Sequence, residues 1–400
     1  MKTTFLSIMI ALVASSLPAQ TTLDTVLQQI ERNNPLLQAL KLEADARMLE
    51  HQTGLMPANP EATVNYLWGN PSALGNRTDI NITQSFEFPT VYFHKARLSE
   101  LQMQRVETEY GLWASVLLYE ARLICLELVY QNALMTALRG RQEHARQIVE
   151  FMKRKFDLGE VTVLDYRKSE MNLLNITGEL RQLEAKQAIL DARLQEMNGG
   201  NPLAIRDTVL GPVMLDTDFE RWFIQITEDQ PVLQWNRLLT EIANREIRLA
   251  SSQRLPGIHG GYMSEKILGQ EFRGFIAGIT IPLWEQRNTV NHAKAKAVAA
   301  KSREETSLLQ YRLRQQSLHE QALHLQQVAS MFQNDLADLS NIELLDKAFQ
   351  KGEITITEYL LELSAYYQSS VQLFHLQYEA HLLAAELYNP FPEQTTQRSP

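Results

Sequence analysis

Residues 159–166 read GEVTVLDY, and residues 352–359 read GEITITEY. Four of the eight residues are identical, and most of the others are close substitutions such as valine for isoleucine. The two octapeptides lie 193 residues apart, and Pro89 and Pro282 repeat at the same offset. A segment written twice at one offset, together with its landmarks, indicates that the chain duplicates one structural unit.

Each octapeptide has the residues of a tight turn between two helices. Its glycine stands where a long helix stops, a position that favours left-handed backbone. A threonine with a carboxylate three residues on has the spacing of a capping box, and the flanking apolar residue and tyrosine have the spacing of a hydrophobic staple. These residues are Gly159, Val161, Thr162, Asp165 and Tyr166 in the first copy, and Gly352, Ile354, Thr355, Glu358 and Tyr359 in the second. The octapeptides therefore predict two helix–turn–helix tips.

The same order of elements is expected on both sides of a loop rich in glycine and proline. Asn34 is a fitting N-cap for a helix that opens at Pro35, and Pro231 opens its counterpart. Period-two alternation follows in both halves and predicts two β-hairpins, with Ile80, Ile82, Phe86 and Phe88 on one face of one strand. The expected segments are a signal peptide (1–20), a first repeat (21–197: hairpin 61–88, long helix 90–157, tip 158–162, helix 162–197), a linker (198–213), a second repeat (214–388: hairpin 257–281, long helix 287–350, tip 351–355, helix 355–388) and a disordered tail (389–400).

Helix lengths indicate how these elements combine. A helix of about 22 residues precedes each hairpin, and one of about 36 follows each octapeptide. Together they nearly equal the length of the long helix of about 65 residues between them. Two shorter helices stacked end to end would lie beside one long helix of roughly 100 Å. Four strands cannot close a barrel, and exposed strand edges promote aggregation. A ring of several copies would close the barrel and pair the exposed strand edges.

Composition narrows the class of protein. The net charge is −9 without a basic stripe, which argues against a nucleic-acid partner. Lys2, an apolar run over 5–14 and a small-residue exit near 20 predict a secretory signal peptide, since the run is too short for a membrane helix. The single cysteine, Cys125, excludes an intrachain disulfide and is expected to be a buried, inert thiol.

Catalytic signals are missing from the sequence. The histidine pairs 319/324 and 375/381 lack the i,i+4 spacing of metal ligands on one helix face. Neither a G-x-S-x-G elbow, a Walker loop nor a G-x-G-x-x-G fingerprint occurs. We therefore expect no enzyme, no resident metal and no cofactor.

Over about residues 22–388 the chain resembles the TolC-type outer-membrane efflux protein family. The resemblance rests on the duplication, the NPLL helix opening at 34–37, both hairpins and both G-E-[VI]-T tips. It implies a mainly α fold with a small β part: a homotrimer with an α-barrel of duplicated helical hairpins, and four strands per chain in a shared 12-stranded transmembrane β-barrel. The implied function is a passive outer-membrane channel that joins a periplasmic adaptor and an inner-membrane pump. Many members carry an acylated N-terminal cysteine; here anchoring is expected to rest on outer-membrane lipid around the barrel.

The resemblance also implies roles for the tips. The residues that would contact the adaptor are Leu158, Gly159, Val161, Thr162, Lys351, Gly352, Ile354 and Thr355. Asp165, Glu358 and Glu362 would form rings of carboxylates at a periplasmic gate, which would favour cations. For Asp165 and Glu358 helix capping is the competing interpretation, and the two roles can coexist; an exposed helical glutamate such as Glu362 is usually only solvated.

Two alternatives stay open. One is an exported periplasmic coiled-coil adaptor or scaffold, although adaptors usually have one helical hairpin and more β-structure. Within the channel class, the acidic tips lean towards the heavy-metal branch, whereas a multidrug or type I secretion conduit is also compatible with the sequence because the pump selects most of the cargo.

Overall fold

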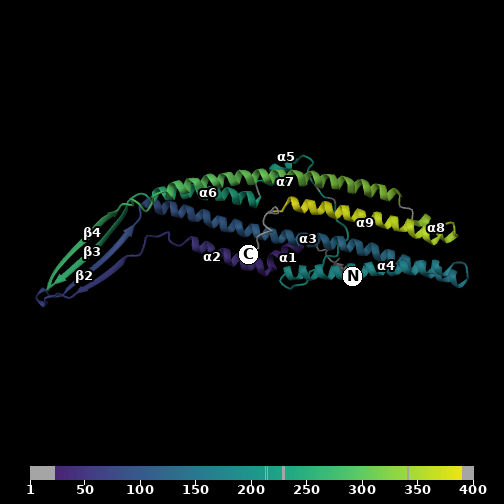
Figure 1. Ribbon diagram of the computed structural model, residues 1–400, viewed down its shortest axis with the longest axis horizontal. Coiled ribbons are helices and arrows are strands. Elements are labelled where there is room, and N and C mark those ends of the chain that lie inside the picture. Colours follow the sequence, from purple (N-terminus) through teal and green to yellow (C-terminus); the bar gives the residue numbers. More distant parts are fainter. Residues whose placement is uncertain (1–22, 212, 214, 228–229, 340–341, 390–400) are drawn as a thin grey trace, which may run out of the picture. The chain divides into compact units, whose positions relative to one another are not determined.

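The computed structural model describes residues 23–211, 213, 215–227, 230–339 and 342–389. The predicted signal peptide and nearly all of the predicted tail lie outside these residues. Figure 1 shows the elements in chain order, mostly helices with one sheet. The helices are α1 (Leu23–Asn33), α2 (Pro35–His51), α3 (Pro89–Asp157), α4 (Val163–Met197), α5 (Phe219–Thr227), α6 (Pro231–Ser252), α7 (Thr289–Leu339), α8 (Ile342–Lys351) and α9 (Ile356–Leu387), with a short 3₁₀ helix at Ser72–Leu74.

The described strands form one antiparallel sheet in the order β1-β2-β3-β4. They are β1 (Glu61–Leu67), β2 (Arg77–Phe86), β3 (Gly257–Ile267) and β4 (Gln270–Thr280). Each expected hairpin forms, and the central pairing of β2 with β3 joins the two hairpins, for example through Phe86 opposite Ile258. Hence β1 and β4 are paired on one side only, which leaves each with an open edge.

The chain divides into two compact units, and each unit draws on both halves of the sequence. We call residues up to 33, 121–212 and 328–379 the tip unit, because it contains both octapeptides. Residues 34–120, 213–327 and from 380 onward form the sheet unit. The two compact units do not coincide with the two expected sequence repeats, because each unit contains segments of both repeats. The division into tandem repeats stays a prediction from the sequence.

The sheet unit has its aromatic core where α5 lies on longer helices. Trp222 and Phe223 of α5 are buried with Tyr311 of α7 and Leu387 of α9. At the start of α2, Asn34 is the N-cap as predicted, and its side-chain oxygen accepts a hydrogen bond from the backbone N–H of Leu37 at 3.0 Å. This core and this cap hold the helices that lead into the sheet.

In the tip unit, α3, α4 and α9 are linked by polar as well as apolar contacts. Asn132 of α3 donates to the carbonyl of Ile205 at 2.9 Å and accepts from the side chain of Gln187 at 2.7 Å. Tyr130 of α3 and Tyr378 of α9 stack with ring centroids 4.7 Å apart. Cys125 is fully buried, as predicted, and burial raises the pKa of its thiol to about 12, which disfavours the reactive thiolate.

Candidate functional site

Both octapeptides end a helix with the same left-handed glycine. Gly159 has φ 76° and Gly352 has φ 75°. In each, the glycine N–H donates to the carbonyl three residues back, and the next N–H donates to the carbonyl five residues back, at 2.9–3.0 Å. This is the Schellman pattern of helix C-termini. A Cβ at either glycine would meet nothing within 4 Å, so backbone conformation alone explains the residue.

Replacing Gly352 with alanine is therefore expected to destabilise the tip by about 1–2 kcal/mol, because an L-residue strains in left-handed backbone. Gly140 offers a matched control, since it lies inside α3 and its Cβ would also meet open space. Gly140→Ala is expected to stabilise the helix by about 0.5–1 kcal/mol. Thermal unfolding of the purified protein checks the opposite signs, and equal shifts would contradict the assignment.

The threonine of each tip caps the following helix, as the spacing predicted, whereas the carboxylate completes the capping box only in the second tip. The N–H groups of Asp165 and Glu358 donate to the hydroxyls of Thr162 and Thr355, each at 3.2 Å. In the second tip the box is reciprocal, because the Thr355 N–H donates to the Glu358 carboxylate at 2.8 Å. In the first tip the shorter Asp165 carboxylate accepts from the Thr162 hydroxyl at 2.6 Å.

These bonds also favour the ionised form of the two tip carboxyls. The hydroxyl of Thr162 holds the pKa of the Asp165 carboxyl below its usual range, and Lys168 adds to this effect. The backbone N–H of Thr355 does the same for the pKa of Glu358. Hydrogen bonds to the ionised form favour it, so both carboxylates are ionised at neutral pH. The capping contribution is present above the unfolded-state pKa and is lost as the pH falls through the lowered folded-state pKa.

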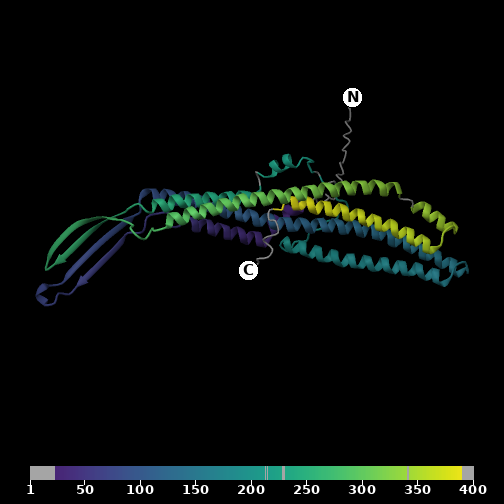
Figure 2. The same cartoon turned by 45° about the horizontal axis from the view of Figure 1, so that its top comes forward.

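A hydrophobic cluster, which we call the tip core, lies behind the two turns. Its buried members come from α3, α8 and α9, and the apolar residues of both predicted staples belong to it or pack against it. Figure 2 shows the end of α3 and the start of α4 at the same end of the tip unit as α8 and the start of α9. The buried members are Ile148, Met152, Phe349, Ile356, Tyr359 and Leu363.

One polar cluster crosses the tip core, formed by the buried Tyr359 and the half-buried His144 and Asp346. The Tyr359 hydroxyl donates to the Asp346 carboxylate at 2.6 Å and lies 3.1 Å from His144 Nε2. His144 Nε2 is also 3.3 Å from the Asp346 carboxylate. Burial raises the pKa of the tyrosine hydroxyl, so it stays a protonated donor. The three residues join α3, α8 and α9, which local sequence patterns did not indicate.

A second polar contact joins the helices that follow the two turns. The Lys168 ammonium donates to the Thr357 hydroxyl at 2.8 Å and lies 3.6 Å from the Asp165 carboxylate. It thus bridges the first turns of α4 and α9. We call Lys168, Asp165 and Thr357 the tip bridge; the sequence analysis found Asp165 but gave no role to the other two.

The other predicted site residues are mostly exposed. Leu158 follows the end of α3, and 72% of its surface is exposed. Lys351 ends α8, and 72% of its side chain is exposed. Glu362 is exposed on α9 and makes no hydrogen bond or ion pair with another described residue. The structure therefore places the expected adaptor-contact residues at the turns, and Glu362 one helical turn beyond Glu358.

The sheet has one apolar face and one largely polar face. Directly opposed residues of antiparallel strands share a face, so the pairing identifies each set. Most apolar side chains of the apolar face are solvent-exposed, although large exposed apolar surfaces are rare in soluble proteins. This face carries Val64, Tyr66, Ile80, Ile82, Phe86, Ile258, Tyr262, Phe275 and Ile279, together with Thr78, Gln84 and Ser264, and with Lys266, Glu271 and Arg273 toward the β3–β4 loop. The other face carries Glu61, Thr63, Asn65, Arg77, Asp79, Asn81, Thr83, His259 and Glu265, with the apolar residues Leu67, Met263, Ile267, Phe272 and Ile276 among them.

Within the described ranges, every helix falls short of the length or apolarity that a membrane span requires. The described residues also contain no group of three or more histidine, cysteine, aspartate or glutamate side chains that could hold a metal ion.

Similar folds occur among solved structures. CusC, described with transmembrane channel formation, superposes with a TM-score of 0.76 and 15% identity over 93% of this chain and 92% of CusC. The Campylobacter jejuni CmeC outer-membrane channel gives 0.68 and 15% over 93% and 86%. The Vibrio cholerae outer-membrane protein VceC gives 0.71 and 12% over 92% and 94%. No protein-family model and no curated protein sequence matches the chain.

The predicted fold class is confirmed by these likenesses: long duplicated helical hairpins with a four-stranded antiparallel sheet within the described residues. The chain has the fold of TolC-type outer-membrane channels, as its sequence resemblance implied.

Proposed function

We propose that this chain is the subunit of a trimeric outer-membrane channel in a tripartite efflux system. Three copies would close a shared β-barrel in the outer membrane, and their helices would form a periplasmic conduit. The channel would be passive, without an enzymatic step or cofactor. Its periplasmic tips would meet an adaptor protein linked to an inner-membrane pump, and that pump would supply the cargo.

The exposed apolar face of the sheet carries this proposal. Ile82, at 46% exposed, and Phe275, at 90% exposed, lie on this face, and the sheet unit offers no layer that covers them. The strands β2, β3 and β4, with 10–11 residues, match the length that a tilted transmembrane strand needs, whereas β1 has 7 residues. An apolar outward face with a polar inward face is the arrangement of transmembrane barrels.

Open edges at β1 and β4 support assembly. A single sheet of this size cannot close on itself, and lipid offers no hydrogen bonds to an open strand edge. If β4 of one copy pairs with β1 of the next, three copies give twelve strands and no edge. A periplasmic scaffold, the alternative class, would leave both the apolar face and the edges in water.

Membrane fractionation tests this proposal. The protein is expected to stay in the outer-membrane fraction through an alkaline carbonate wash and to leave it only with detergent. Release by carbonate would show a peripheral or soluble protein and would favour the scaffold.

For the tips we propose a gate that combines the tip bridge with a set of carboxylates. The tip bridge would hold α4 and α9 of one copy together, and the carboxylates of Asp165, Glu358 and Glu362 would line its narrow end. The eight adaptor-contact residues would then be displaced when the adaptor docks. Support comes from the bridge itself, because the hydrogen bond of Lys168 to Thr357 is a polar contact between α4 and α9 that a single substitution would remove.

Neutralising the gate carboxylates is expected to weaken cation preference in planar-bilayer conductance. Asp165→Asn keeps an acceptor for the cap but removes the charge. At about 6 Å through water a unit charge contributes ~0.7 kcal/mol, or roughly threefold in local cation concentration. Glu100→Gln, a paired carboxylate of the sheet unit, serves as control. An unchanged permeability ratio in the triple variant of Asp165, Glu358 and Glu362 would leave these residues as helix caps only.

A further inference from the structure

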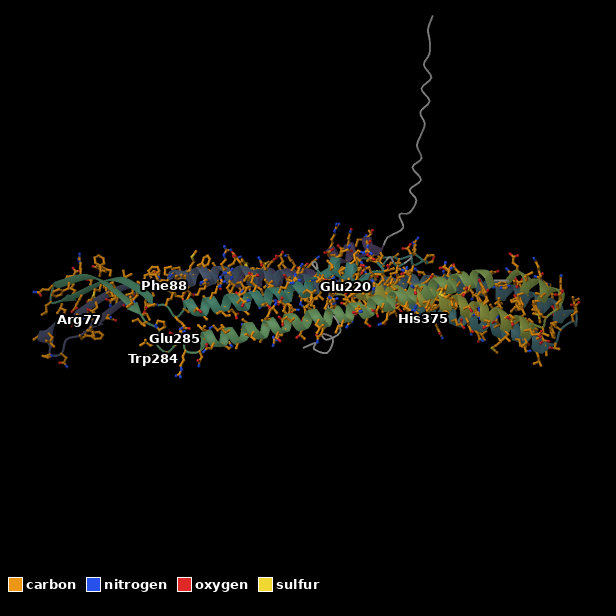
Figure 3. The ribbon with its side chains drawn as sticks, turned by 90° about the horizontal axis from the view of Figure 1, so that it is seen from above. Arg77, Phe88, Glu220, Trp284, Glu285 and His375 are labelled. Atoms are coloured by element: carbon orange, nitrogen blue, oxygen red, sulfur yellow. The ribbon has the colours of Figure 1, made fainter. Side chains whose placement is uncertain are left out.

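A cleft lies where the sheet meets the helices of the sheet unit. Its volume is about 530 Å³, and its walls come from the ends of β2 and β4, the start of β3 and the first turns of α3. Figure 3 shows Phe88, Trp284 and Glu285 at this junction, beside the helical end of the sheet. Neither the tips nor the gate explains this cleft.

The cleft continues the apolar face of the sheet. Phe86 and Ile258 pair across β2 and β3 on that face, and both line the cleft. They are 45% and 51% exposed, and Met56 beside them is 82% exposed. Acyl chains that cover the apolar face would therefore reach the cleft without crossing a polar boundary.

The polar side of the cleft carries both signs of charge. Lys95 forms an ion pair with Glu87 at 2.5 Å, and the Glu87 N–H donates to the Tyr92 hydroxyl at 2.9 Å. Glu285 is exposed at the rim and makes no ion pair with a described residue. One ammonium against two carboxylates leaves an excess negative charge, which an added cationic group would balance.

The level of the cleft fits a lipid headgroup. Trp284, 81% exposed, follows Leu283, 67% exposed, at the helical end of the sheet. Tryptophan is enriched where membrane proteins cross from hydrocarbon to water, because its ring is apolar and its N–H is polar. The apolar face thus ends at Phe86 and Ile258, and the charged groups of the cleft lie directly beyond them.

We propose that this cleft binds a zwitterionic phospholipid with a phosphoethanolamine headgroup. Its ammonium would pair with Glu285, its phosphate would contact Lys95, and its acyl chains would follow Phe86 and Ile258. The inference rests on the proposed outer-membrane location. The negative excess disfavours an anionic headgroup such as phosphoglycerol.

Native mass spectrometry of the detergent-purified, delipidated protein tests the site. Phosphatidylethanolamine or phosphatidylglycerol with the same acyl chains is added, and bound lipid per chain is counted. We expect preferential retention of phosphatidylethanolamine, lowered about tenfold by Glu285→Gln, since a charge-assisted hydrogen bond is lost. Lys95→Met should lower retention of both lipids. Glu271→Gln, at the loop end of the sheet, is the control with unchanged retention.

The outcomes separate the site from the proposed function. Equal retention of both lipids, unaffected by Glu285→Gln, in a protein that needs detergent for extraction would overturn the headgroup site and leave the channel standing. A protein released from membranes without detergent would overturn the channel and the lipid site together.

Discussion

Replacing Ile82 with lysine is expected to prevent or strongly weaken assembly in the outer membrane. Ile82 lies in the middle of the apolar face, opposite Ala62 on β1 and Tyr262 on β3. A lysine on the lipid face of a barrel costs about 2–4 kcal/mol at the bilayer midplane. That cost corresponds to a loss of roughly 30- to 1000-fold in the ratio of inserted to free protein. The measurement is the amount of detergent-extracted, assembled protein relative to total protein.

The adjacent residue supplies the matched control. Asn81 lies on the same strand and points to the polar face, so Asn81→Lys adds the same charge to a surface expected to face water. We expect its assembly to stay close to that of the unsubstituted protein. If the two lysines had equal effects, the apolar face would not be the lipid-facing surface.

Replacing Tyr359 with alanine is expected to destabilise the tip unit by about 3–5 kcal/mol, the usual cost of deleting a large buried aromatic side chain. Tyr359 is 1% exposed and stacks on Phe349 with ring centroids 4.4 Å apart. The variant also removes the hydroxyl that donates to the half-buried Asp346 carboxylate. Hydrogen exchange of the amides over 352–363 should accelerate by more than about a hundredfold, following the lowered opening energy.

The duplication provides the control for this prediction. Tyr166 occupies the corresponding place in the first octapeptide but is only half-buried, with its ring stacked on Phe156 at 5.7 Å. Tyr166→Ala is expected to cost about 1 kcal/mol. Tyr359→Phe separates packing from hydrogen bonding, since it removes only the hydroxyl. Equal destabilisation by the two alanine variants would contradict the central place of Tyr359 in the tip core.

Local patterns in the sequence were enough to predict the tips and both hairpins. Left-handed glycine, the N-cap threonine and the carboxylate three residues on depend on neighbours within one turn, so a short segment contains the whole determinant. The same holds for Asn34, whose cap is formed three residues away. Alternation likewise assigned the two faces of the strands in the first hairpin, because side chains of a strand alternate.

Contacts between distant segments could not be predicted in the same way. The pairing of β2 with β3 joins residues about 180 apart, and nothing local specifies which hairpin edges meet. The His144–Asp346–Tyr359 cluster and the contact of Lys168 with Thr357 depend on which helices become neighbours. The sequence marked Tyr359 only as a staple residue. That its hydroxyl contacts His144 and Asp346 became clear only from the structure. The shared spacing also hid a difference between the tips. The Glu358 carboxylate reaches the backbone N–H of Thr355, whereas the shorter Asp165 carboxylate bonds the hydroxyl of Thr162.

The most direct test of the proposed function is the mass of the detergent-extracted protein, measured by light scattering with the detergent contribution subtracted. The proposed twelve-stranded barrel contains three copies of this 45.8 kDa chain, less any cleaved signal peptide, and we expect a trimer that is stable on dilution. A monomer obtained without detergent would contradict the account, because neither the apolar face nor the two strand edges would then have the partner that the channel requires.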